Sequence, residues 1–248
     1  MLRAALLPFL VSEASDGKVR VPGIGAVMLL PEELSLLHSS LEGKSSYFEF
    51  GSGASTVHVA ARFPDLRIVS VDTDAAWSGT VQRHRWLRAN GSSGSRVRVR
   101  HVDLGPVQAF GYPLQNLSYC TYLRRRCLVL GHQGSCIHET CAKREFVGLR
   151  STWPRFSDAV LEEMPRGGWD VVMVDARFRV ACALKSLQAL KPNGLVLVHD
   201  WQDGRGYEEI QNYARLEMVI KSLALFRPLK SADQRQRHAA RRFEYTPG

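Results

Sequence analysis

The sequence predicts an α/β protein with a doubly wound, mostly parallel seven-stranded sheet, helices on both faces and a C-terminal antiparallel hairpin. Three observations support this fold class. Short apolar segments alternate with helical patterns, the first apolar segment runs straight into a glycine turn, and polar residues follow one apolar segment after another. Continuous apolar strands separated by helices are typical of a parallel sheet covered on both faces. A chain of 248 residues can bury one large core of this kind.

The expected elements alternate along the chain. A helix at 31–38 comes first, because a proline and two glutamates occupy its first turn. Residues 191–194, Lys-Pro-Asn-Gly, are expected to form a turn, and 90–95 a loop. The periodicity predicts strands at 46–50, 67–71, 97–102, 169–174 and 195–198, helices at 54–63, 74–88, 156–164, 178–190 and near 207–213, and a hairpin of 217–220 with 223–226.

The domain organisation follows from these patterns and from the distribution of charge. We expect a leader and helical cap at 1–44, the sheet domain at 45–230 with an irregular insertion at about 105–150, and a basic tail at 231–248. The net charge of +9 is concentrated at 124–126 and 235–242. A solvated basic surface explains such clusters, and nucleic-acid binding through the tail is the alternative. Neither cluster has the interleaved aromatic residues of a base-stacking platform.

The cysteines do not indicate a disulfide scaffold. There are five, an odd number, and Cys182 lies in a run expected to be a helix facing the sheet. The remaining four lie in the insertion with two histidines, but they lack a CxxC pair, so an irregular insertion is favoured over a zinc site; these residues are Cys120, Cys127, Cys136, Cys141, His132 and His138.

The N-terminal residues have a basic residue and a short apolar stretch without a clear small-residue cleavage site, which favours a cytoplasmic location over secretion. No later segment approaches the ~20 apolar residues of a membrane span. The sequence predicts neither the compartment firmly nor the oligomeric state.

A glycine turn follows the first strand of the expected sheet. Gly51 can adopt a positive φ there, and Gly53 lets the backbone approach a ligand without a Cβ. Ser55 or Thr56 can begin the next helix, whose free N–H groups need partners. Asp72 ends the second strand about 20 residues further on, the spacing at which a carboxylate meets ribose hydroxyls. These two features together predict a nucleotide pocket.

Acidic residues collect at one rim of the expected sheet. In an open doubly wound sheet, ligands bind beyond the carboxyl ends of the strands. Any single aspartate there is explained by a helix cap or a turn. Five together form a like-charge cluster that needs a cation, hydrogen bonds or a ligand to offset it. The residues are Asp72, Asp74, Asp103, Asp175 and Asp200, with Arg177 and His199 among them.

In this combination the chain resembles the class I S-adenosylmethionine-dependent methyltransferases, which have a Rossmann-like fold. The resemblance runs in the family's order from about residue 45 to 200, and the hairpin extends it to about 227. It is carried by the motifs at 49–56, 71–72, 101–104, 169–175 and 190–197. More narrowly, the motifs at 51–56, 174–181 and 199–200 resemble a poorly characterised methyltransferase-like group.

The resemblance implies S-adenosylmethionine as cofactor and assigns roles around it. Glu49 would lie near its ammonium, Asp72 would accept hydrogen bonds from its ribose, and Asp103 would lie near the adenine amine. The other implied cofactor residues are Gly51, Ser52, Gly53, Ser55, Thr56 and Asp175.

On the acceptor side, His199 and Asp200 are the candidates for removing the acceptor's proton, and capping of the next helix explains them equally well. Arg177, Arg205 and Tyr207 are the candidate acceptor-binding residues, for a small molecule or glycan with anionic or sugar-like character. The same arginines would also be ordinary on a solvated surface.

A divalent cation is the further alternative at this rim, because Asp175 and Asp200 resemble metal-binding positions of the catechol and caffeoyl coenzyme A O-methyltransferases. Arg177 is close to Asp175 in sequence and offers a guanidinium in place of an ion, so we predict no metal.

Two other functions remain open at this point. The same glycine turn suits a nicotinamide-dependent oxidoreductase, NAD or NADP, although Ser55 stands where a third glycine is expected. An acidic rim also suits a cationic sulfonium better than a pyrophosphate. The second alternative is a non-catalytic methyltransferase-like module that binds nucleic acid or protein through its basic insertion and tail.

Overall fold

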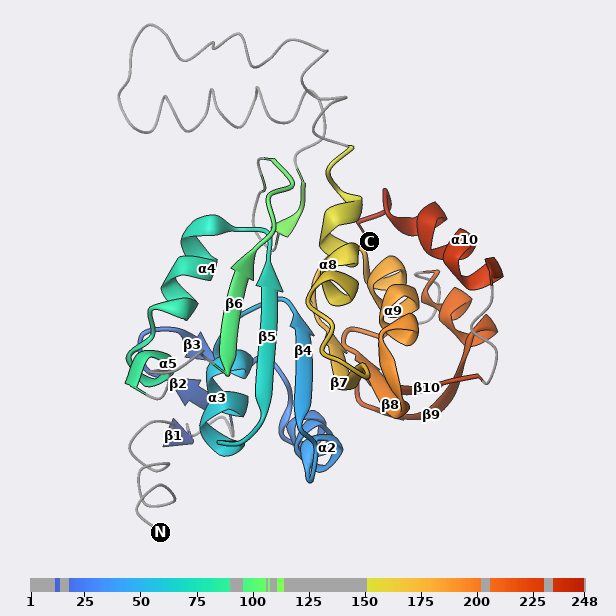
Figure 1. Cartoon of the computed structure of the whole chain (residues 1–248). Helices are drawn as coiled ribbons and strands as arrows, with labels where there is room; N and C mark the ends of the chain where they lie inside the picture. Colours follow the sequence, from blue (N-terminus) through green and yellow to red (C-terminus); the bar gives the residue numbers. More distant parts are fainter. Residues whose placement is uncertain are drawn as a thin grey trace, which may run out of the picture.

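The computed structural model describes residues 12–13, 18–89, 96–105, 107, 111–113, 151–201, 206–229 and 234–247. Its centre is a seven-stranded sheet in the order β6-β5-β4-β7-β8-β10-β9 (Figure 1). The strands from β6 to β8 are parallel, and β10 pairs antiparallel with β8 and β9. This confirms the predicted fold class. The strands are β4 Ser46–Phe50, β5 Arg67–Asp72, β6 Val97–His101, β7 Trp169–Val174, β8 Leu190–Val198, β9 Ala214–Ile220 and β10 Leu223–Pro228.

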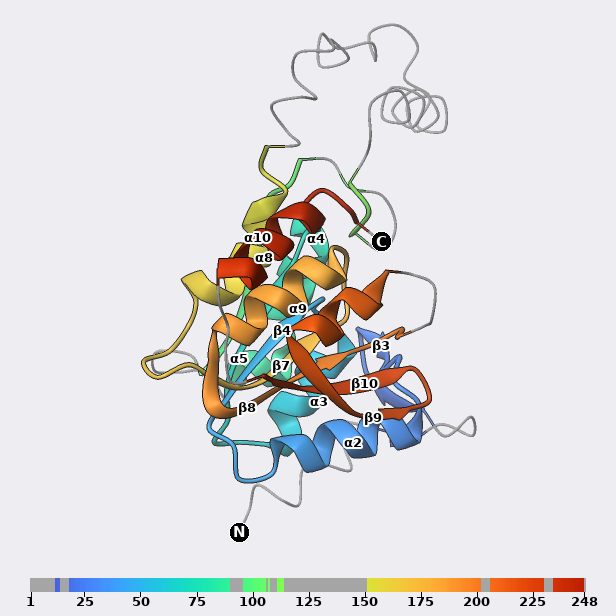
Figure 2. The same ribbon diagram turned by 90° about the vertical axis from the view of Figure 1, so that its right-hand side faces the viewer.

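Helices cover both faces of the sheet, as Figure 2 shows in the edge-on view. One face carries α2 Pro31–Leu41, α3 Ala54–Arg62, α4 Ala75–Gln82 and α5 Arg85–Ala89. The other carries α8 Pro154–Glu162, α9 Arg179–Gln188, α10 Gln234–Phe243 and the 3₁₀ helix η4 Tyr207–Asn212. A small antiparallel sheet precedes α2 and consists of β1 Ser12–Glu13, β2 Val19–Val21 and β3 Gly25–Ala26.

The core has two halves because successive side chains of a strand point to opposite faces of the sheet. In β4, Tyr47 packs into the core with α2 and α3, whereas Phe48 and Phe50 pack into the core with α8 and α9. All residues of β4 are buried. The continuous apolar strands therefore reflect burial on both faces, as expected for a parallel sheet.

Three elements differ from the predictions. The expected helix at 74–88 is broken into α4 and α5 near Arg83. The expected turn at 191–194 is part of β8, where the pairing of β7 with β8 shifts register between Trp169 and Val171 and makes the Lys-Pro-Asn-Gly segment a bulge. The helical signal near 207–213 is a 3₁₀ helix. At 191–194 the local turn signal was correct, but pairing with β7 decided the conformation.

The expected basic tail contains a helix that packs on the domain. Ala239 and Ala240 of α10 are buried, and Gln236 donates a hydrogen bond to the backbone oxygen of Leu184 in α9 at 2.6 Å. The sequence did not predict this helix, because its apolar face consists of alanines in a segment that is otherwise rich in arginine. The insertion residues 114–150, including the arginines at 124–126 and the candidate zinc ligands, lie outside the described residues.

Cys182 is buried in α9 with a free thiol, as predicted for a helix that faces the sheet. Among the described residues, no helix combines the length and the apolar character that crossing a membrane requires.

Candidate functional site

A cavity of about 980 Å³ lies at the carboxyl ends of β4, β5, β7 and β8. The chain leaves β4 toward β5 and β6 on one side and returns to β7 and β8 on the other, so β4 and β7 flank the point where the strand order reverses. Loops diverge at such a point and leave a crevice, which is where open α/β sheets bind ligands. The topology therefore places the cavity where the sequence predicted a pocket.

The glycine turn forms the base of the cavity between β4 and β5. Gly51 has φ of +95°, and its N–H donates to the backbone oxygen of Val71 at 2.8 Å. A Cβ at this position would lie 2.3 Å from the backbone oxygen of Asp175, so only glycine allows β4 and β7 to approach here. Gly53 is extended with φ of 173°, and a Cβ there would meet only Trp77, at 3.8 Å.

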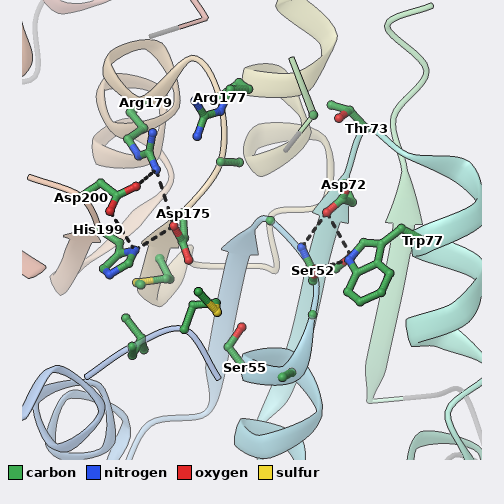
Figure 3. Close-up of a pocket in the computed structure, with 18 of the residues that line it drawn as sticks. Ser52, Ser55, Asp72, Thr73, Trp77, Asp175, Arg177, Arg179, His199 and Asp200 are labelled. Carbon is green, nitrogen blue, oxygen red and sulfur yellow. Dashed lines mark hydrogen bonds and ion pairs between the residues drawn. The ribbon is translucent and has the colours of Figure 1, made fainter. Parts of the chain in front are cut away.

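Asp72 joins the end of β5 to this turn. One of its oxygens accepts hydrogen bonds from the N–H of Ser52 at 3.0 Å and from the Ser52 hydroxyl at 3.3 Å, and the other accepts from the N–H of Asp74 at 3.0 Å. Burial raises the pKa of Asp72, although these hydrogen bonds oppose the shift. The carboxylate lines the cavity (Figure 3).

Trp77 completes this half of the site. Its indole N–H donates to the backbone oxygen of Ser52 at 2.7 Å, and its ring is 36% exposed and lines the cavity. Asp74 caps the helix that carries it by accepting the Trp77 backbone N–H at 2.9 Å. Trp77 was not among the site residues predicted from the sequence. The available signal was an aromatic residue in the first turn of the helix that follows Asp72.

Glu49 lies below the cavity and does not line it. Its carboxylate is 1% exposed and accepts hydrogen bonds from the Ser55 hydroxyl at 2.6 Å and from the Thr56 hydroxyl. Burial raises the pKa of Glu49 to about 7, even though these hydroxyls lower it. The oxygens of Glu49 are turned toward α3, and its expected contact with a cofactor ammonium stays a prediction. Thr56 is also buried away from the cavity, whereas Ser55 lines it.

The opposite half of the cavity is centred on His199, at the end of β8. Its Nδ1 lies 3.0 Å from a carboxylate oxygen of Asp175, and its Nε2 lies 3.5 Å from Glu33 of α2 (Figure 3 shows the Asp175 contact). Asp200 is 3.8 Å from Nδ1 and is held at 2.7 Å by Arg179, which also lies 3.6 Å from Asp175. Three carboxylates and two basic side chains thus form one cluster.

Electrostatics in this cluster favour a protonated imidazole. Burial alone would lower the pKa of His199, but the hydrogen bond to Asp175 and the charges of Asp175, Asp200 and Glu33 outweigh burial and raise it. Burial would likewise raise the pKa of Asp175, but His199 and Arg179 outweigh burial and lower it. Both pKa shifts favour the charged forms of His199 and Asp175, which make an ion pair.

Glu33 is a site residue that the sequence analysis assigned only to a helix start. Its side chain is 1% exposed, accepts hydrogen bonds from the Leu30 N–H at 2.8 Å and from the N–H and hydroxyl of Ser222 at 2.8 Å, and lines the cavity. Burial would raise its pKa, but these hydrogen bonds outweigh burial and lower it. The carboxylate facing His199 is therefore ionised at neutral pH.

Three side chains of this cluster have the spacing of a metal site, and an arginine lies between two of them. The ligand atoms of Asp175, His199 and Asp200 lie within 4.8 Å of one another, a spacing that a metal ion accepts. Arg179, whose side chain is 2% exposed, bridges Asp175 and Asp200 and offsets part of their negative charge. The prediction that a guanidinium takes this place named Arg177, and the structure assigns the two contacts to Arg179 instead.

The fold of this chain is similar to that of solved structures. No protein-family model and no curated protein matches the chain. A methyltransferase-like protein from Silicibacter pomeroyi is similar over 89% of this chain and 97% of its own, with 24% identity and a TM-score of 0.65. The chain has the class I methyltransferase fold.

Weaker likenesses include a TehB-like SAM-dependent methyltransferase from Corynebacterium glutamicum, at 10% identity and a TM-score of 0.41 over 79% of this chain and 87% of its own. The N-methyltransferase NodS from Bradyrhizobium japonicum also matches at 10% identity and a TM-score of 0.41, over 80% of this chain and 95% of its own.

Within this methyltransferase fold, the structure brings together most of the predicted site residues. Those that line the cavity are Gly51, Ser52, Gly53, Ser55, Asp72, Asp175, Arg177, His199 and Asp200. Arg205 lies outside the described residues.

Besides Glu49 and Thr56, two more predicted residues are absent from the lining. Asp103 is exposed, and its carboxylate accepts the N–H of Gly105 at 2.8 Å, which makes it a turn residue. Tyr207 is 2% exposed and packs its ring against Trp201 in the core. Neither side chain lines the cavity, and their expected roles at the adenine and at the acceptor stay predictions. Position after a strand did not reveal which way either side chain turns.

The backbone beside the His199 half of the cavity is strained at two positions. Phe178 has φ of 58° and Asp200 has φ of 55°, values that side chains with a Cβ rarely adopt. Phe178 is buried near Trp153 and Phe156, with ring centroids at 5.6 and 6.3 Å, and this packing holds the turn between Arg177 and Arg179. The turn positions both arginines at the cavity.

Proposed function

We propose that this protein transfers a methyl group from S-adenosylmethionine to an oxygen or nitrogen of a small-molecule or glycan acceptor. One observation carries the proposal: at the switch point of a methyltransferase fold, Asp72 is hydrogen-bonded into a glycine turn on one side of a cavity, and an ionisable cluster faces it from the other. The two halves suit a cofactor and an acceptor, respectively.

The cofactor half offers contacts for each part of the methyl donor. Asp72 accepts the ribose hydroxyls through lone pairs that its backbone contacts leave free, and the exposed ring of Trp77 offers a stacking face to the adenine. Gly53 and Ser55 border the methionine portion. The ionised carboxylate of Asp175 favours a cationic sulfonium over a pyrophosphate at this place.

In the acceptor half, His199 receives the acceptor's proton. Asp175 holds Nδ1, so Nε2 is the nitrogen that accepts a proton, and Glu33 stabilises the imidazolium that results. When bound, S-adenosylmethionine would supply a methyl group on a cationic sulfur, which would leave as a neutral thioether once the acceptor's lone pair has taken the methyl group. Asp200 is bound by Arg179 and keeps that side chain in position.

This role sets the pH dependence of turnover. His199 accepts a proton only in its neutral form, and its pKa is raised above the ordinary value of 6.5. The rate should therefore increase with pH through the raised pKa and level off above it, at a more alkaline pH than for an unperturbed histidine. A rate that is independent of pH from 6 to 9, roughly the range around histidine titration, would rule out this role.

Calorimetric titration with S-adenosylhomocysteine tests the proposal. The wild-type protein should bind it, and Asp72→Asn should bind at least about tenfold more weakly, because hydrogen bonds to a charged acceptor contribute about 1.5–3 kcal/mol each. Asp65→Asn is the matched control, since Asp65 is exposed at the opposite end of β5. A wild-type protein that binds neither S-adenosylmethionine nor its product would refute the proposal, and binding of NAD alone would support the oxidoreductase alternative.

A further inference from the structure

Two arginines flank the strained turn after β7, and both line the cavity (Figure 3). Among the described residues, six buried side-chain nitrogen or oxygen atoms have no hydrogen-bond partner, and three of them belong to these arginines: Nε of Arg177, and Nε and Nη1 of Arg179. Buried donors without an acceptor are destabilising, so their concentration on one wall of a cavity points to a ligand that accepts hydrogen bonds.

Two carboxylates bind one nitrogen of the Arg179 guanidinium, and its other two nitrogens have no hydrogen-bond partner in the part of the chain that the structure describes. Its Nη2 contacts Asp200 at 2.7 Å and Asp175 at 3.6 Å, while the side chain is 2% exposed. These contacts fix its guanidinium plane and neutralise its charge. The two remaining nitrogens are therefore held in place, and both are buried from solvent.

Arg177 has no such carboxylate partner. No described acidic group lies within 4.0 Å of its guanidinium, and no dashed line reaches it in Figure 3. Its charge lowers the pKa of Asp175 through space, without an ion pair. The guanidinium carbon lies 4.3 Å from the centroid of the Tyr112 ring. Stacking occupies the face of the guanidinium and leaves the N–H donors at its edge available in the plane.

We infer that Arg177, which shares this wall of the cavity with Arg179, binds an oxyanion carried by the methyl acceptor: a carboxylate, a phosphate or a sulfate. A guanidinium with a stacked face and a free edge suits two-point binding of such a group. The acceptor is thus an acid whose anion is held on this wall while its nucleophile faces the methyl donor. The inference rests on the proposed function for the identity of the ligand as an acceptor.

The same chemistry has a second source, the carboxylate of the cofactor's own methionine portion. A comparison of S-adenosylhomocysteine with 5′-methylthioadenosine, which lacks that carboxylate, separates the two. If Arg177 serves the acceptor, Arg177→Gln should leave the affinity for both nucleosides unchanged. If it serves the cofactor, the variant should weaken binding of S-adenosylhomocysteine alone, and the inference would be wrong.

Inorganic phosphate is the probe for the acceptor's anion. It is titrated by calorimetry into the wild-type protein, Arg177→Gln and Arg67→Gln, with and without saturating S-adenosylhomocysteine. Arg67 is the matched control, because its guanidinium also stacks on an aromatic ring, 5.7 Å from the Trp169 centroid, but at the opposite end of the sheet. We expect saturable binding by the wild type and Arg67→Gln, and at least about tenfold weaker binding by Arg177→Gln.

Absence of saturable phosphate binding by the wild type, or equal binding by Arg177→Gln, would overturn the inference. Because phosphate is also titrated without the nucleoside, failure of cofactor binding is seen separately and counts against the proposed function instead. If Arg177→Gln does not fold, chemical modification of the wild-type protein by phenylglyoxal tests the inference instead. Phenylglyoxal modifies arginines, and phosphate should protect Arg177 from it but not Arg67; equal labelling of Arg177 with and without phosphate would contradict the assignment.

Discussion

Glu49 should make the stability of this protein fall as the pH rises from 5 to 8. The carboxyl group is 1% exposed, and its pKa is raised from 4.5 to about 7. Between these two values the unfolded chain releases a proton that the folded protein retains. Stability contributed by this group is therefore fully present below pH 4.5 and is lost as the pH rises through about 7.

The magnitude follows from the shift. A difference of about 2.5 pKa units corresponds to about 3 kcal/mol of unfolding free energy at about 1.4 kcal/mol per unit, most of it lost between pH 5 and pH 8. Glu49→Gln removes this titration and keeps the size of the side chain. Its free energy of unfolding relative to the wild type should therefore improve by about 2–3 kcal/mol between pH 5 and pH 8.

Urea unfolding of both proteins at several pH values measures the difference. Other groups titrate in the same range, including His199, but they contribute to both proteins and cancel in the comparison. Glu42→Gln is the control, since Glu42 is exposed in the turn after α2. If the curves of wild type and Glu49→Gln stay parallel from pH 5 to 8, roughly the span of the raised pKa, Glu49 does not titrate as its burial requires.

Three further changes test other parts of the structure. Gly51→Ala should lower the unfolding free energy by about 3 kcal/mol or more, because the new Cβ clashes with Asp175. Gly43 has φ of +69° but open space around it, so Gly43→Ala should lower the unfolding free energy by only about 1 kcal/mol. Urea unfolding measures both, and equal losses would show that the clash at Gly51 is relieved. Glu33→Gln should lower the pKa of His199, measured by NMR titration of its ring protons, and an unchanged pKa would exclude the contact. Tyr207→Phe removes a buried hydroxyl without a partner among the described residues, so in urea unfolding it should leave stability unchanged or raise it by up to about 1 kcal/mol. A lower stability of the variant would show that the hydroxyl has a partner.

The sequence was sufficient to predict the sheet, because burial on both faces makes each parallel strand a continuous apolar run with turn residues at its end. The glycine turn and Asp72 were also predictable, because both lie within a short unit of strand, turn and helix whose conformation depends on local sequence. The 191–194 bulge and α10 were not predictable in this way, because pairing with β7 and packing on α9 determine them.

By itself, the sequence determined the order of strands and helices, the edge of the sheet where ligands bind, and most of the side chains at that edge. Only the tertiary structure decided which of them meet. Glu33 reaches His199 from a helix far away in the chain, Arg179 rather than Arg177 bridges the aspartates, and Tyr207 turns into the core. Spacing specifies the strand end after which a residue falls, whereas packing against distant segments decides the direction of its side chain and the charges that surround it.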